Sequence, residues 1–116
     1  MTKLRQERFN ALIKQNIAKI IYENIRDKRI KNITIEQAKV SPDLHNATIY
    51  FSLQDDKKKK STLIALQNAR KFIRKRLAQI LNLRYTPEIK FEYDSLEKVA
   101  FSVEKLIESE GKKYDN

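Results

Sequence analysis

The chain has 116 residues, 41% of them hydrophobic, which is typical of one small globular domain and excludes a wholly disordered chain. It has no cysteine, one histidine and a single glycine, which excludes disulfides, cysteine nucleophiles, cysteine or histidine metal cages and glycine-rich phosphate loops. Its 25 basic and 15 acidic residues leave a formal net charge of +10, which favours an anionic partner.

The sequence contains no recognisable targeting segment. No apolar run has the length of a membrane span, and residues 1–5 lead into a charged helix rather than a signal peptide. We therefore expect a soluble, cytoplasmic binding domain.

Residues 4–26 are predicted to form the first helix. Apolar residues recur three or four positions apart and make one stripe, which consists of Phe9, Leu12, Ile13, Ile17, Ile20, Ile21 and Ile25. The helix should end near the charged residues 27–29.

Two strands are predicted next, over residues 33–41 and 47–54. In the first, Ile33 and Ile35 have one parity and Ala38 and Val40 the other, so we expect a bulge or a later start. In the second, alternate residues share one apolar face, namely Ala47, Ile49, Phe51 and Leu53. The turn-forming residues 42–46 between the strands predict an antiparallel hairpin.

A long helix is predicted after a polar loop at residues 55–60, which we expect to be mobile because its four consecutive lysines repel one another. Ser61 is predicted to cap the helix, which should run to about Leu83. Its core-facing arc contains Leu66, Ala69, Ile73, Leu77 and Ile80. A second arc contains Lys71, Arg74, Lys75, Ala78 and Asn82, with Arg70 at its border.

The last predicted elements are a strand and a helix. Ile89, Phe91 and Tyr93 alternate with charged residues after Pro87. Asp94 opens a helix that ends at Gly111, with a stripe made of Leu96, Val99, Ala100, Val103, Leu106 and Ile107. We expect one domain over residues 1–110 and a frayed tail over 111–116.

The positive charge is concentrated in one part of the chain. Residues 57–90 hold eleven basic residues and one acid, Glu88, whereas the basic and acidic residues elsewhere cancel. Such a local field suits a polyanion, of which nucleic acid is the commonest in the cytosol. A solvated lysine-rich surface is the alternative interpretation.

Several stretches of this sequence resemble one known family. In the first half they are Asp27–Ile30, Val40–Leu44 and Ala47–Ser52. In the second half they are Phe72-Ile73-Arg74, Leu77, Leu83-Arg84, Pro87, Ile89, Phe91 and Asp94. In order and spacing they are similar to bacterial ribosome-binding factor A over about residues 5–108.

The resemblance implies an α+β fold of the KH-like type II class. The implied order is α-β-β-α-α-β, with helices on one face of a three-stranded sheet and a further C-terminal helix. Members of the family bind the immature 30S ribosomal subunit and its 16S rRNA precursor. They assist late maturation, including 5′-end processing of that RNA, and have no catalytic activity. The resemblance thus implies a monomer that is not an enzyme, with no cofactor, no metal and no membrane partner.

The sequence departs from the expected backbone clamp. A KH domain holds nucleic acid with a Gly-x-x-Gly loop, and this chain has no glycine there. The family instead has an Ala-x-Gly kink, where this chain reads Ala69-Arg70-Lys71. Lys71 therefore stands in place of the glycine, and the sequence leaves open whether the helix bends.

The candidate RNA-binding residues are basic. Arg70, Lys71, Arg74 and Lys75 are predicted to contact phosphates, the alternative being a solvated helix face. Long-range attraction is predicted for Lys57, Lys58, Lys59 and Lys60, the alternative being a solvated loop. Phe72 is the best candidate for stacking on a base, ahead of Tyr50 and Tyr85. The alternative interpretation is an aromatic side chain packed at the margin of the helix.

Other function classes fit the sequence less well. A metal-dependent nuclease needs converging carboxylates, and Asp55 and Asp56 lie in the predicted loop. His45 lies in a predicted turn without a second histidine and is interpreted as a turn residue. Loose adsorption to an acidic membrane stays open, as does a general basic KH-like nucleic-acid-binding module unconnected with ribosome assembly.

Overall fold

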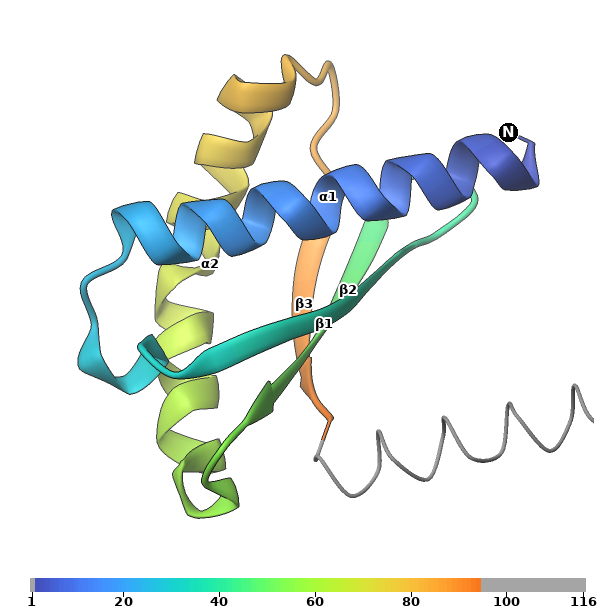
Figure 1. The fold of residues 1–116 in the computed structure, drawn as a ribbon. Coiled ribbons are helices and arrows are strands. Elements are labelled where there is room, and N and C mark those ends of the chain that lie inside the picture. The colour runs from blue at the N-terminus through green and yellow to red at the C-terminus, as the bar shows by residue number, and fades with distance from the viewer. Residues whose placement is uncertain (1, 95–116) are drawn as a thin grey trace, which may run out of the picture.

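The computed structural model describes residues 2–94, which form a mixed α+β fold (Figure 1). Its helices and strands, in chain order, are α1 (Lys3–Asn24), β1 (Ile33–Val40), β2 (Asn46–Leu53), α2 (Lys59–Leu81) and β3 (Glu88–Tyr93). Short 3-10 turns, η1 (Lys28–Ile30) and η2 (Asp56–Lys58), precede β1 and α2. The predicted last helix and the frayed tail lie outside the described residues.

The three strands form one sheet with β2 in the centre. β1 and β2 are antiparallel, which confirms the predicted hairpin, whereas β3 runs parallel to β2. The pairing register shifts between Ile35 and Gln37, which confirms the predicted bulge. The extra residue puts both Ile35 and Ala38 on the buried face, because it restores the alternation that the sequence interrupts.

Both helices lie on the same side of the sheet, and α1 crosses above the strands (Figure 1). The core that they enclose includes Ile13 and Ile17 of α1 and Leu66, Ile73 and Leu77 of α2. From the sheet it includes Ala47, Ile49, Phe51, Ile89 and Phe91. The predicted stripes of both helices are therefore confirmed in their central residues. Leu12 of α1 and Ile80 near the end of α2 are corrections, because each is 41% exposed.

The predicted loop before α2 is wrong. Asp56–Lys58 form a 3-10 turn, and Lys59 and Lys60 belong to α2 itself. The Asp55 carboxylate caps this turn by accepting a hydrogen bond from the Lys57 N–H at 3.0 Å. Ser61 does not cap the helix, because its hydroxyl donates to the Lys58 carbonyl.

α2 is a single continuous helix. Ala69, Arg70 and Lys71 are all helical, so the two consecutive helices of the expected order are one element here. The helix ends near the predicted residue, because Asn82 has a left-handed backbone with φ of 51° and the Leu83 N–H returns to the Ala78 carbonyl.

A carboxylate holds the connection between α1 and β1. Asp27 caps η1 by accepting from the Arg29 N–H at 3.0 Å, and its Oδ2 pairs with Arg29 Nη2 at 2.6 Å. These contacts with Arg29 lower the pKa of Asp27 to about 2. The hydroxyl of Thr62 then donates to the Arg29 carbonyl at 2.9 Å and ties this connection to α2.

Replacing Asp27 by Asn should therefore change how stability depends on pH. The folded-state pKa lies below the unfolded value, so the ionised carboxylate stabilises the fold above about pH 4, and this contribution is lost as pH falls toward about 2. We expect thermal melts to show Asp27→Asn less stable than the native chain at pH 6, with the gap closing by pH 2. Asp56→Asn, at an exposed carboxylate, is the matched control. A gap independent of pH would contradict the role of this ion pair.

Candidate nucleic-acid interface

The outward face of α2 carries free positive charge. Lys71 and Lys75 are exposed and lie one helical turn apart, so their ammonium groups can approach neighbouring phosphates. Within residues 2–94 neither has a hydrogen bond or an ion pair. Arg70 is also exposed and precedes them at the edge of this face. The structure thus places these three predicted residues on one face of α2, and no acidic side chain within residues 2–94 pairs with them.

Arg74 differs from its neighbours. Its Nη2 donates to the Thr86 carbonyl at 2.8 Å, its Nε donates to the Pro87 carbonyl at 3.1 Å, and its Nη1 lies 3.1 Å from Glu88 Oε1. The sequence predicts that Arg74, like Lys75, lies on an exposed face of the helix, and this is wrong because its guanidinium is bonded to the chain after α2. Its guanidinium holds the connection between α2 and β3, because those two carbonyls point toward the helix and need a donor.

The four lysines Lys57–Lys60 lie around the N-terminal end of α2. Lys59 is partly engaged, because its ammonium sits over the Tyr93 ring at 5.0 Å from the centroid. Cations at this end of a helix are unfavourable, since they add to the positive end of the helix dipole. The N-cap residue, Lys58, forms no side-chain capping hydrogen bond, because its ammonium cannot accept one from a backbone N–H. The positive potential of this end is therefore high, and an anion would relieve it.

The two basic groups lie along one helix. Lys60 and Lys71 are eleven residues apart, which corresponds to about 16 Å along the axis. The residues between them on the outward face include Gln67 and Asn68, both exposed, and Ile64. A nucleic-acid backbone could therefore meet positive charge at both ends of α2 and uncharged side chains between them.

The sequence profile of Ribosome-binding factor A matches residues 5–107. The chain belongs to this family. A Ribosome-binding factor A from Coxiella burnetii is 36% identical over 112 residues, which cover 97% of this chain and 94% of that protein. The resemblance seen in the sequence is confirmed.

Solved structures of the Ribosome-binding factor A family share the fold. The crystal structure of the Thermus thermophilus protein has a TM-score of 0.69 at 23% identity and covers 76% of this chain and 94% of that one. A homology model of the Thermus thermophilus protein fitted into the cryo-EM map of a 30S complex has a TM-score of 0.62 at 23% identity. It covers 72% of this chain and 88% of that one.

The three aromatic candidates of this Ribosome-binding factor A family chain lie in different places. Phe72 is on α2 and is 47% exposed, so its ring is neither fully packed nor fully free, and stacking on a base stays a prediction. Tyr50 lies on the opposite face of the sheet with the Lys39 ammonium 5.7 Å from its ring centroid. Tyr85 is exposed in the connection after α2, against Arg84. They do not form one stacking platform.

The remaining polar residues show no catalytic grouping in the part of the chain that the structure describes. His45 lies in the β1–β2 turn, where the Asp43 carboxylate accepts from the Ser41 hydroxyl and the His45 N–H. These hydrogen bonds lower the pKa of Asp43. No group of three or more His, Asp or Glu side chains within residues 2–94 could hold a metal ion. In the same range no helix has the length and apolar character needed to cross a membrane.

Thr62 and Arg74 have structural roles that were not predicted from the sequence. Thr62 is fully buried in the apolar stripe of α2, four residues before Leu66, and this spacing could have revealed it. The part played by Arg74 had no local signal, because its partners lie twelve to fourteen residues further along the chain.

Proposed function

We propose that this chain binds the small ribosomal subunit as a monomer and contacts its 16S rRNA through α2. The observation that carries the proposal is the basic group of Arg70, Lys71 and Lys75 on the outward face of a helix, in a chain of the Ribosome-binding factor A family. Within residues 2–94 none of these three side chains has a hydrogen bond or an ion pair. The homology model of the Thermus thermophilus protein, fitted into the cryo-EM map of a 30S complex, supports the choice of partner.

Binding through this face would be directed mainly at phosphates. Lysine and arginine on a helix recognise charge and backbone spacing rather than base edges. The uninterrupted helix offers no glycine clamp, so shape and charge replace it. We propose that the protein acts in late maturation of the subunit, including 5′-end processing of the 16S rRNA precursor, by binding and without catalysing a reaction itself.

The proposal is tested by sedimentation with native ribosomal particles on sucrose gradients. We expect the tagged protein to migrate with free small subunits in the cytoplasmic fraction and to be absent from translating ribosomes. A protein that stays at the top of the gradient at low and moderate salt would contradict the proposal. Binding to unrelated RNA and to small subunits with equal affinity would instead favour a general nucleic-acid-binding module.

The electrostatic part predicts a strong salt dependence. If about five phosphates are neutralised, affinity for the small subunit should fall by roughly two orders of magnitude when salt concentration rises fourfold. The measurement is the slope of the logarithm of the binding constant against the logarithm of salt concentration. A slope near zero would show that basic charge does not drive binding.

A further inference from the structure

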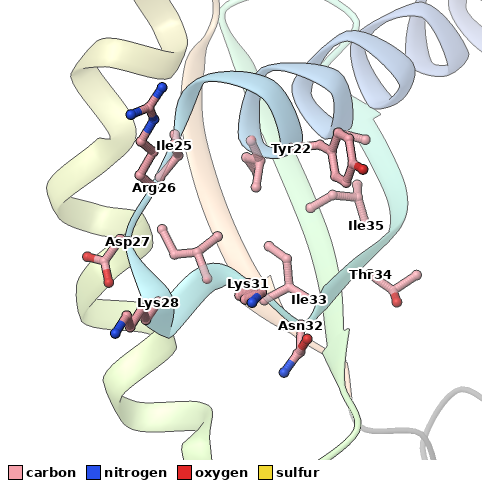
Figure 2. Close-up of a pocket in the computed structure, with 13 residues that line it drawn as sticks. Tyr22, Ile25, Arg26, Asp27, Lys28, Lys31, Asn32, Ile33, Thr34 and Ile35 are labelled. Carbon is pink, nitrogen blue, oxygen red and sulfur yellow. The ribbon is translucent and has the colours of Figure 1, made fainter.

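A groove whose lining contains no residue of α2 is not used by the proposed function. It has a volume of about 950 Å³ and lies between the second half of α1, the connection through η1 and the start of β1. Figure 2 shows Tyr22 and Ile35 toward one side of it and Arg26, Asp27 and Lys28 on the connecting segment at the other. Its position sets it apart from the outward face of α2.

The groove combines an apolar lining with a positive rim. Isoleucines from three elements line it, and they are Ile21, Ile25, Ile30, Ile33 and Ile35. Arg26, Lys28 and Lys31 are exposed around it, and within residues 2–94 none of them has an acidic partner within 4 Å. Tyr22, beside them, is 90% exposed. This combination suits an apolar segment that carries acidic side chains.

The adjoining strand edge is protected at one end only. β1 is an edge strand, and at its far end the Val40 N–H donates to Asn10 Oδ1 at 2.9 Å while Gln6 Nε2 donates to the Val40 carbonyl at 2.8 Å. The described residues place no such side chain on the backbone of residues 33–35. Soluble proteins usually cover an apolar strand edge, so this end is a suitable surface for a docked segment.

We propose that the C-terminal segment of the same chain, centred on residues 99–108, folds back and occupies this groove. Its sequence places an apolar stripe at helical spacing, which consists of Val99, Ala100, Val103, Leu106 and Ile107. Glu97, Glu104 and Glu108 are seven and four positions apart, so in a helix they lie along one flank of that stripe. Lys98 and Lys105 lie on the opposite flank. The segment thus has apolar side chains that match the lining and one acidic flank that matches the basic rim.

The connection has the required length. β3 remains bonded to β2 as far as Asp94, whose N–H donates to the Phe51 carbonyl at 2.7 Å. Tyr93 pairs with Phe51, which pairs with Ile35, so the chain leaves the sheet about 10 Å from the groove, two strand spacings away. Each extended residue spans at most about 3.5 Å, so residues 95–98 reach the groove if they are extended. The docked helix would then begin after these residues and not at Asp94, where the sequence predicts its start.

The docked segment would also change the distribution of electrostatic potential on the surface. It would place acids over Arg26, Lys28 and Lys31 and so confine the strongest positive potential to α2. Because the groove is on the α1 and β1 side, docking would leave Lys71 and Lys75 free.

Paramagnetic relaxation in the full-length protein tests the proposal, since the sequence has no cysteine and a single nitroxide can be attached at Ser102→Cys. Ser102 lies beside the stripe, on the side away from the acids. We expect the amide signals of residues 21–35 to lose most of their intensity, and those of 70–76 to keep theirs. Unchanged signals at 21–35, or loss at 70–76 instead, would overturn the proposal.

Two further measurements identify the occupant and the charge contribution. One sample would mix isotope-labelled protein that has no nitroxide with nitroxide-bearing protein that has no isotope label. The amide signals of residues 21–35 should keep their intensity in this mixture. Loss of intensity there would mean that a second copy occupies the groove. Arg26→Glu with Lys31→Glu should restore the intensities, whereas Lys14→Glu with Lys19→Glu, an equal charge change at exposed positions on α1, should not. If both pairs of substitutions restored the intensities equally, the proposed attraction between the acids of the segment and the basic rim would be wrong.

Discussion

Replacing Lys71 and Lys75 together by Glu is expected to weaken binding to the small ribosomal subunit on the order of 100-fold. Each ammonium is exposed and has no partner within residues 2–94, so each can donate to a phosphate in the complex. A hydrogen bond between charged groups contributes about 1.5 kcal/mol, and the loss of two corresponds to roughly two decades in affinity. Repulsion from the new carboxylates adds to this loss.

The matched control separates local contact from net charge. Lys14→Glu with Lys19→Glu makes the same change of four charge units at exposed positions on α1. We expect that control to bind nearly as well as the native chain at moderate salt, where distant charges are screened beyond about 10 Å. The measurement is subunit binding over a series of salt concentrations, and the α2 variant should also show a shallower slope. Equal losses in both variants would show that only total charge matters and that α2 is not the contact face.

Replacing Arg74 by Ala is expected to destabilise the fold by about 2 kcal/mol, whereas Lys75→Ala should change stability by less than about 0.5 kcal/mol. Arg74 donates to the carbonyls of Thr86 and Pro87 and pairs with Glu88, so its loss leaves those carbonyls without their donor. Replacing one of these two adjacent residues is thus expected to lower the free energy of unfolding, and replacing the other is expected to leave it nearly unchanged. Urea denaturation of the two variants measures the difference directly.

The conservative substitution at the same position sharpens this test. Arg74→Lys keeps the charge but cannot reach two carbonyls and a carboxylate at once, so we expect an intermediate loss of stability. If Arg74→Ala unfolds at the same urea concentration as Lys75→Ala, the connection between α2 and β3 does not depend on the guanidinium. RNA binding by Arg74 variants should be measured at a temperature where they remain folded, because unfolding would mimic a lost contact.

The different contacts of Arg74 and Lys75 show why the number of positive residues on a helix is a poor guide to an interface. Lys71, Arg74 and Lys75 share one arc of α2, and each would count equally in a tally of positive residues. Their contacts differ, because among these three residues Arg74 alone is hydrogen-bonded, within residues 2–94, to the connection between α2 and β3. The phosphate-binding assignment of Arg70, Lys71 and Lys75 remains a prediction that the binding experiments test.

Local sequence patterns were sufficient to predict most helices and strands of the described residues. Apolar spacing of three and four predicted α1 and α2, alternation predicted β2 and β3, and a parity slip between Ile35 and Ala38 predicted the bulge. The concentration of positive charge in residues 57–90 could also be counted directly. The resemblance carried by short ordered stretches identified the family correctly.

Features that depend on residues far apart in the chain could not be predicted from local patterns. Repulsion between four lysines predicted a loose loop, but the Asp55 cap and the continuing helix make residues 56–60 helical. Thr62 bonds to Arg29, Arg74 bonds to Thr86 and Pro87, and the groove is formed by α1 meeting an edge strand. Periodicity records which face of an element is buried, but the partner of a polar side chain depends on chain reversals that no local pattern contains.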